Sequence, residues 1–194
     1  MSGPVGVLQK KSRTDIIWIC DCSKSMKGKR KSASMNVMIR EITNELSEIL
    51  NESPSTEINI RTLKFSNSAE WVNTSFVPVQ SFSWTDLNPE GISNLGYAFE
   101  AISKEFKGNS PEKDTYDRYR IVLILISDGY PTDNWRIPLE DMKDLLKGHN
   151  PVYCIIRIPG ISEEVISAFV GEGPDRNHRV MTCDDIENII QLVR

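Results

Sequence analysis

The chain has 194 residues, of which 39% are hydrophobic and 26% are charged, and its formal net charge is −4. These values are ordinary for a globular protein, and the length suits a single domain with a sizeable core. The negative charge argues against general binding to nucleic acid. We also expect neither a signal peptide nor a membrane helix, because the N-terminus lacks an apolar core and no run approaches roughly 20 apolar residues.

Strand and helix patterns alternate along almost the whole chain. We expect residues 1–12 to form a flexible N-terminus and residues 13–194 to form a single domain. Apolar runs and period-two alternation predict the strands, and apolar residues at spacings of three and four predict the helices. In chain order the expected elements are a strand at 13–20, a basic loop at 24–31, a helix at 34–51, strands at 57–65 and 69–79, a loop at 81–93, a helix at 94–107, a charged insertion at 109–119, a strand at 120–127, a helix at 138–147, a strand at 151–158, a helix at 162–170, a strand at 178–182 and a terminal helix capped by Asp184 or Asp185.

Three of the expected strands, 13–20, 120–127 and 151–158, are nearly continuous apolar runs. Such runs are typical of strands buried on both faces of a parallel sheet. The strand at 69–79 follows its neighbour through a tight turn and contains Pro78, so we expect it to pair antiparallel at the sheet edge. The predicted fold class is therefore α/β, with a doubly wound, mostly parallel sheet, one antiparallel edge strand and helices on both faces.

Polar side chains follow two of the buried strands at the point where each strand ends. The first strand runs into Asp21, which begins the pattern D-x-S-x-S with Ser23 and Ser25, and a later strand runs into Asp128. A third loop, directly before the helix at 94–107, offers the hydroxyl of Ser93. Because ligands of doubly wound folds bind at the carboxyl ends of the strands, we expect these three loops to meet.

Hydroxyl and carboxylate oxygens are ligands that Mg²⁺ accepts, in a nearly octahedral arrangement that usually keeps several waters. Two hydroxyls and one nearby carboxylate would not neutralise the ion, which would then still attract an anion. Mn²⁺ or Ca²⁺ are alternatives, although a site with few carboxylates favours the smaller ions. A lone D-x-S-x-S can also be an ordinary polar loop after a strand. The two further loops strengthen the metal interpretation.

Three short motifs occur in one order along the chain. They are D-C-S-K-S-M from Asp21, G-I-S-N-L-G from Gly91 and I-S-D-G-Y-P-T-D-N-W from Ile126. They resemble the three metal loops of the von Willebrand factor type A (vWA) domain, and the resemblance extends over about residues 13–193. The third motif also resembles the stand-alone tellurite-resistance TerY family of vWA proteins. The resemblance implies a vWA/Rossmann-like fold and a binding function rather than an enzyme.

The resemblance also implies a metal-ion-dependent adhesion site (MIDAS). In such a site Ser23 and Ser25 would bind Mg²⁺ through their hydroxyls, and Asp21 and Asp128 would hold bound waters. Ser93 lies where the family usually has Thr, so the hydroxyl is present without the methyl that restrains its rotamer. The open position on the ion would take a Glu or Asp carboxylate from a protein partner. The TerY family further implies a bacterial stress-response or phosphorylation-linked scaffold, with a protein kinase and a protein phosphatase as partners.

Several of these residues have simpler interpretations. Ser93 could cap the helix that follows it, and Asp128 could be a turn residue before Gly129. Asp133 could brace its own loop. Trp135 could be a packing residue rather than an anchor at an interface.

Two other functions stay open. A metal-dependent hydrolase would need a general base near the ion, for which only Asp133 and Glu90 lie in the loops. The sequence has no phosphate-binding glycine loop and no nucleophile elbow. A structural interaction domain with a non-functional metal site would instead bind partners through its edge strand or its terminal helix.

The first metal loop continues into a basic run. Such a run is usually a solvated face, but beside a metal it could steer an acidic protein partner toward the ion. Binding to nucleic acid is not expected, because the run lacks interleaved aromatic residues. The residues of this basic run are Lys24, Lys27, Lys29, Arg30 and Lys31.

The four cysteines, Cys20, Cys22, Cys154 and Cys183, show no C-x-x-C spacing. Three of them lie in or beside apolar strands, so we expect the cysteines to be reduced, small core or loop residues. Neither histidine has ligand spacing with a cysteine, so a zinc site is not expected. Reduced thiols are typical of a cytoplasmic protein, which is the location that we expect.

Overall fold

The computed structural model describes residues 11–51, 55–108 and 116–193. Most of the N-terminus expected to be flexible lies outside these ranges, as does most of the expected insertion at 109–119, while Ser12 already belongs to the first strand. In chain order the elements are β1 (Ser12–Asp21), the 3-10 helix η1 (Lys24–Arg30), α1 (Lys31–Asn51), β2 (Thr56–Phe65), β3 (Ala69–Trp71), β4 (Val77–Pro78), η2 (Val79–Ser81), α2 (Leu95–Gly108), β5 (Arg118–Ser127), α3 (Arg136–Leu146), η4 (Lys147–His149), β6 (Pro151–Arg157), α4 (Glu163–Val170), α5 (Arg176–Arg179), β7 (Val180–Met181) and α6 (Ile186–Val193).

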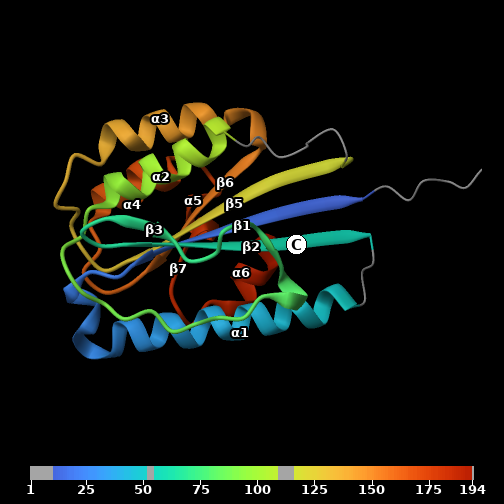
Figure 1. Ribbon diagram of the computed structural model, residues 1–194, viewed down its shortest axis with the longest axis horizontal. Coiled ribbons are helices and arrows are strands. Elements are labelled where there is room, and N and C mark those ends of the chain that lie inside the picture. The colour runs from blue at the N-terminus through green and yellow to red at the C-terminus, as the bar shows by residue number, and fades with distance from the viewer. Residues whose placement is uncertain (1–10, 52–54, 109–115, 194) are drawn as a thin grey trace, which may run out of the picture.

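The strands form one sheet in the order β3-β2-β1-β5-β6-β7, and β4 also pairs with β2. Strands β1, β2, β5, β6 and β7 are parallel (Figure 1). Strands β3 and β4 run antiparallel to β2. The predicted doubly wound, mostly parallel sheet is therefore confirmed. The chain builds outward from β1 first to one side and then to the other, so the strand order reverses between β1 and β5. Ligands of such sheets bind outside this point, at the carboxyl ends of the strands.

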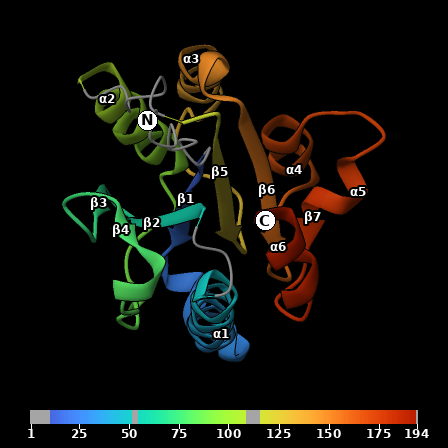
Figure 2. The same ribbon diagram turned by 90° about the vertical axis from the view of Figure 1, so that its right-hand side faces the viewer.

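Helices cover both faces of the sheet, as Figures 1 and 2 show. Ile16 and Trp18 of β1 belong to the core beneath α1 and α6, and Ile17 and Ile19 belong to the core beneath α2, α3 and α4. All four side chains are fully buried, because successive residues of a strand point to opposite faces and both faces are covered here. Within the described ranges, no helix combines the length and the apolar character needed to cross a membrane.

The prediction of a loop over the basic run is wrong. Residues Lys24–Arg30 form η1, and α1 begins at Lys31. The backbone N–H of Met26 donates to the carbonyl of Ser23, which starts the turn, and the Met26 side chain is fully buried. The buried Met26 side chain therefore anchors the basic run to the core and orders its backbone.

The strand predicted at 69–79 is divided into β3 and β4. Between them, the buried guanidinium of Arg61 donates to the carbonyl oxygens of Asn73 and Thr74, and the side chain of Asn73 accepts from the N–H of Thr62. These bonds replace regular strand pairing. The strand predicted at 178–182 is also shorter than expected, because α5 occupies Arg176–Arg179 and leaves only Val180–Met181 for β7.

Candidate metal centre

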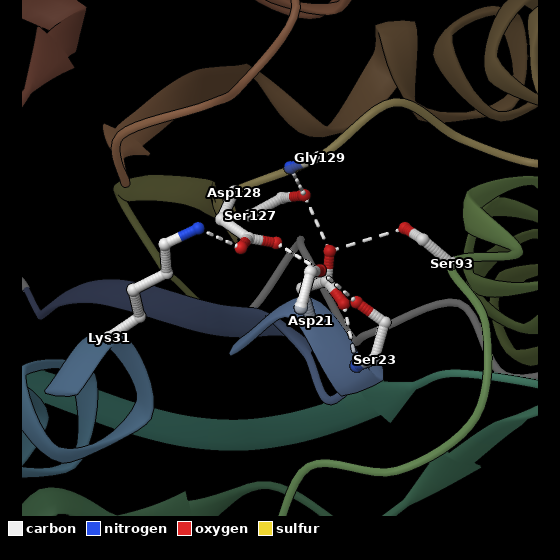
Figure 3. Close-up of polar contacts among 8 residues, drawn as sticks. Asp21, Ser23, Lys31, Ser93, Ser127, Asp128 and Gly129 are labelled. Atoms are coloured by element: carbon white, nitrogen blue, oxygen red, sulfur yellow. Dashed lines mark hydrogen bonds and ion pairs between the residues drawn. The ribbon is translucent and has the colours of Figure 1, made fainter. Parts of the chain in front are cut away.

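All five residues predicted from the three loops lie together at the carboxyl ends of β1 and β5. Figure 3 labels four of them, Asp21, Ser23, Ser93 and Asp128. Asp21 is the last residue of β1, and Ser23 and Ser25 follow it. Asp128 follows the last residue of β5, and Ser93 lies in the loop before α2. Ser25 is exposed, whereas the other four are buried, so the cluster is open to solvent on the side of Ser25.

The carboxylate of Asp21 joins the three loops and has no exposed surface. Its Oδ1 accepts from the backbone N–H of Ser23 at 2.8 Å. Its Oδ2 accepts from the hydroxyl of Ser127 at 2.6 Å and from that of Ser93 at 3.2 Å. Burial raises the pKa of Asp21, and the charge of Asp128 acts in the same direction, although the hydrogen bonds from Ser127 and Ser23 oppose this shift. A cation in the site would therefore stabilise the charged form of Asp21.

The hydroxyls of the first loop are spaced like neighbouring ligands of one ion. Ser23 Oγ and Ser25 Oγ are 3.0 Å apart, and Ser25 donates to Asp128 Oδ1 at 2.7 Å. Adjacent ligands of an octahedral Mg²⁺, each about 2.1 Å from the ion, are about 3.0 Å apart. These two hydroxyl oxygens therefore fit adjacent positions around a small divalent cation.

The donor set is rich in hydroxyls. In the part of the chain that the structure describes, no three His, Cys, Asp or Glu side chains gather in a way that could hold a metal ion. A cation at this site would depend on the three serine hydroxyls, with two carboxylates close by. Such a set suits a hard, oxygen-seeking ion and leaves it with unneutralised charge.

A lysine already neutralises one of the two carboxylates. The ammonium of Lys31, at the start of α1, forms an ion pair with Oδ2 of Asp128, whose side chain has no exposed surface. Gly160 lies over this pair with φ of +117°, and a Cβ there would lie 2.4 Å from the carbonyl oxygen of Asp128. Only glycine adopts this conformation and permits this close approach without strain.

Backbone contacts hold the three loops in place. The N–H of Lys24 donates to the carbonyl of Gly91 at 3.0 Å, and the N–H of Thr132 donates to the carbonyl of Ser93 at 2.8 Å. Gly91 has φ of +78°, and a Cβ there would lie 2.5 Å from Oδ1 of Asn67. The second loop therefore lies between the other two and fixes their spacing.

Two members of the cluster, Ser127 and Lys31, were not among the predicted site residues. The signal for Ser127 was its hydroxyl at the end of a buried strand, directly before Asp128. Lys31 had no local signal beyond its place in a basic run, because its contact depends on how η1 leads into α1.

The structure shows what Ser93, Trp135, Asp133 and Glu90 contact. The hydroxyl of Ser93 donates to Asp21, and Trp135 is 7% exposed within the core under α2 and α3, which confirms its packing role. Asp133 lies against α2, where a Cβ on Gly96 would meet its Oδ2 at 2.7 Å. Glu90 is exposed. Among the described residues, neither the Asp133 nor the Glu90 carboxylate bonds to the five predicted site residues.

Comparison with known proteins gives the fold class of the chain. No family model and no curated protein sequence matches it. The manganese-loaded TRAP protein of Plasmodium vivax is similar, with a TM-score of 0.66 and 16% identity over 95% of this chain and 73% of that one. The ArnB paralog VWA2 of Sulfolobus acidocaldarius is similar with a TM-score of 0.54 and 19% identity, over 95% of this chain and 45% of that one.

Proximal thread matrix protein 1 of the mussel byssus is also similar. One of its structures has a TM-score of 0.62 and 14% identity, over 95% of this chain and 48% of that one. Another, with a zinc-occupied MIDAS motif, has a TM-score of 0.58 and 16% identity, over 96% of this chain and 46% of that one. The chain thus spans about half the length of these mussel proteins. At these identities the likeness concerns the fold alone, and the chain has the vWA-type α/β fold.

Proposed function

We propose that this chain is a metal-dependent protein-binding module whose ion is held by Ser23, Ser25 and Ser93 together with Asp21 and Asp128. The observation that carries the proposal is the convergence of these oxygens from three loops, in which Ser23 Oγ and Ser25 Oγ lie 3.0 Å apart, the separation of adjacent ligands on a small cation. The manganese-loaded and zinc-occupied neighbours support a divalent cation, and Mg²⁺ is the ion we propose.

Each residue would have a distinct role. The hydroxyls of Ser23 and Ser25 would contact the ion, and Asp21 would orient Ser23 and Ser93 through the hydrogen bonds that it already accepts. Asp128 would accept from Ser25 and from water bound to the ion. The ion would supply a positive charge at the open face, where a Glu or Asp carboxylate of a protein partner would bind.

The surface around the cluster suits such a partner. Ile92, which precedes Ser93, is 52% exposed, and Tyr130, which follows the Asp128 turn, is 73% exposed. Large apolar side chains exposed beside an open polar site are typical of interaction surfaces. Lys24 and Lys27 are exposed on η1, next to the first loop. The partner that we propose therefore presents an acidic side chain flanked by apolar ones.

Two more specific assignments extend this proposal. A bacterial stress-response or phosphorylation-linked scaffold of the TerY kind, with a kinase and a phosphatase as partners, rests on the third motif from Ile126 to Trp135. A single cytoplasmic domain over residues 13–194 fits the four free cysteines, three of which are buried.

The test is chemical cross-linking of the tagged protein in its own cell extract, with identification of the captured proteins. We expect capture with Mg²⁺ that is lost with chelator, lost in Asp21→Asn, and reduced in Tyr130→Ser although that variant still binds the ion. Captured proteins that survive both the chelator and Asp21→Asn would contradict the proposal and favour a structural module. Turnover of a phosphoester that disappears in Asp21→Asn would favour the hydrolase.

A further inference from the structure

The ion pair between Lys31 and Asp128 bears on how the site would bind a metal ion. Asp128 accepts from Ser25 on Oδ1 and pairs with the Lys31 ammonium on Oδ2, so the chain's own groups occupy both carboxylate oxygens (Figure 3). The Lys31 side chain is only 16% exposed. Its charge therefore lies within the cluster that would hold the ion.

Two cations beside one partly buried carboxylate repel each other, and the repulsion grows as water is excluded. We propose that Lys31 is a built-in competitor for the metal: its ammonium neutralises Asp128 in the metal-free protein and leaves Asp128 when the ion binds. This inference rests on the proposed function. It adds that the affinity for the ion is set by a residue that is not a ligand, and that the lysine weakens it.

A groove next to Lys31 could accommodate its side chain after it leaves Asp128. Lys31 lines a groove of about 760 Å³ between the first half of α1, the loop after β6 and the loop before α6. The groove is also lined by the carboxylates of Glu41 and Asp184, by the guanidinium groups of Arg30 and Arg157, and by the apolar side chains of Val37 and Ile186. Arg157 already pairs with Glu163. A displaced ammonium would therefore have room, two carboxylates that it could approach, and an apolar wall for its methylene stem.

A purely structural role for Lys31 predicts the opposite change in ion affinity when the lysine is removed. If the lysine only neutralised Asp128 as a scaffold for the first and third loops, its removal would loosen these loops and weaken binding of the ion. If it competes, its removal leaves the buried Asp128 carboxylate with the Ser25 hydroxyl but without a cationic partner. The metal-free protein then becomes less stable, and the ion binds more tightly because it now meets an unpaired charge.

The experiment is calorimetric titration of Mg²⁺ and of Mn²⁺ into chelator-stripped wild type and Lys31→Met, with thermal melts in chelator and with ion. Lys27→Met is the matched control, because Lys27 is an exposed residue of η1 and its replacement removes the same charge. We expect Lys31→Met to bind the ion at least about tenfold more tightly, and Lys27→Met to stay within about twofold of wild type. We also expect a lower melting temperature for Lys31→Met in chelator and a larger gain on adding the ion.

The outcomes separate this inference from the proposed function. Equal or weaker affinity in Lys31→Met, with binding in wild type, would overturn the competitor role and leave the metal site intact. Absence of binding in both proteins at millimolar ion would overturn both proposals. If Lys31→Met does not fold, Lys31→Gln carries the same test, because a glutamine can still hydrogen-bond to Asp128 without a charge.

Discussion

Replacing Asp21 by asparagine should separate the folding of the site from its capacity to hold an ion. The asparagine has the same shape as the aspartate, and its Oδ1 can still accept from the N–H of Ser23. Its amide N–H₂ would face the hydroxyls of Ser93 and Ser127, which can rotate to accept instead of donate. All three contacts of Asp21 therefore have replacements.

The two effects of this change differ strongly in size. The free energy of unfolding of the metal-free protein should change by no more than about 1 kcal/mol, because the hydrogen bonds are kept and a buried charge is removed. Two unit charges 4 Å apart at an effective dielectric constant of 20 interact by about 4 kcal/mol, and a divalent ion doubles this to about 8. If lost hydration cancels roughly two thirds, about 3 kcal/mol remains, which is a loss of affinity of about 100-fold.

The assay is titration of Mg²⁺ into wild type and Asp21→Asn, with denaturant unfolding of both proteins in chelator. Asp133→Asn is the matched control, because it makes the same chemical change in the third loop at a carboxylate that does not bond to the five predicted site residues. Ion affinity in Asp21→Asn within a few fold of wild type, with the fold intact, would refute the assignment of Asp21 to the metal centre. An unfolded variant would refute the argument that its contacts can be replaced.

Three further predictions follow from the same contacts. Ser93→Ala removes the hydroxyl that donates to Asp21, and titration should show ion affinity reduced by about tenfold; unchanged affinity would exclude Ser93 from the site. Gly160→Ala forces a Cβ into the carbonyl of Asp128 at positive φ, and denaturant unfolding should show a loss of about 2 kcal/mol or more, whereas a neutral result would show that this loop shifts freely. In chelator, burial keeps the pKa of Asp21 in the folded protein above its ordinary value of 3.8. This group therefore stabilises the fold fully below pH 3.8, and its contribution is lost as the pH rises through the folded pKa. The free energy of unfolding of wild type minus that of Asp21→Asn should fall over this window, and a difference that does not change with pH would contradict the prediction.

The sheet and the convergence of the five predicted residues could be predicted because their signals are local. Continuous apolar runs identify strands buried on both faces, and the end of each run identifies where a polar loop must begin. Asp21 and Asp128 end such runs on adjacent strands, so their proximity follows from the topology alone. The motif order then adds Ser93 from the second loop.

What could not be predicted depends on contacts between distant segments. The division of the strand at 69–79 results from Arg61, whose buried guanidinium binds carbonyls twelve and thirteen residues further along the chain. The position of Lys31 beside Asp128 spans 97 residues and depends on η1 turning the chain into α1. No period or spacing in the sequence encodes either contact. Both involve a long cationic side chain, whose reach makes its partner hard to predict from sequence.

The order of η1 bears on how a partner would be captured. Seven residues of the predicted basic loop form a 3-10 helix, held to the core by the fully buried Met26. Fixing a residue's backbone opposes folding by about 1–2 kcal/mol, and in η1 this loss of entropy has already occurred in the unbound protein. Lys24 and Lys27 are thus presented preorganised. When an acidic partner binds, only the side chains of these lysines would lose conformational entropy. Less of the favourable electrostatic energy would then be offset, and the affinity for the partner would be higher.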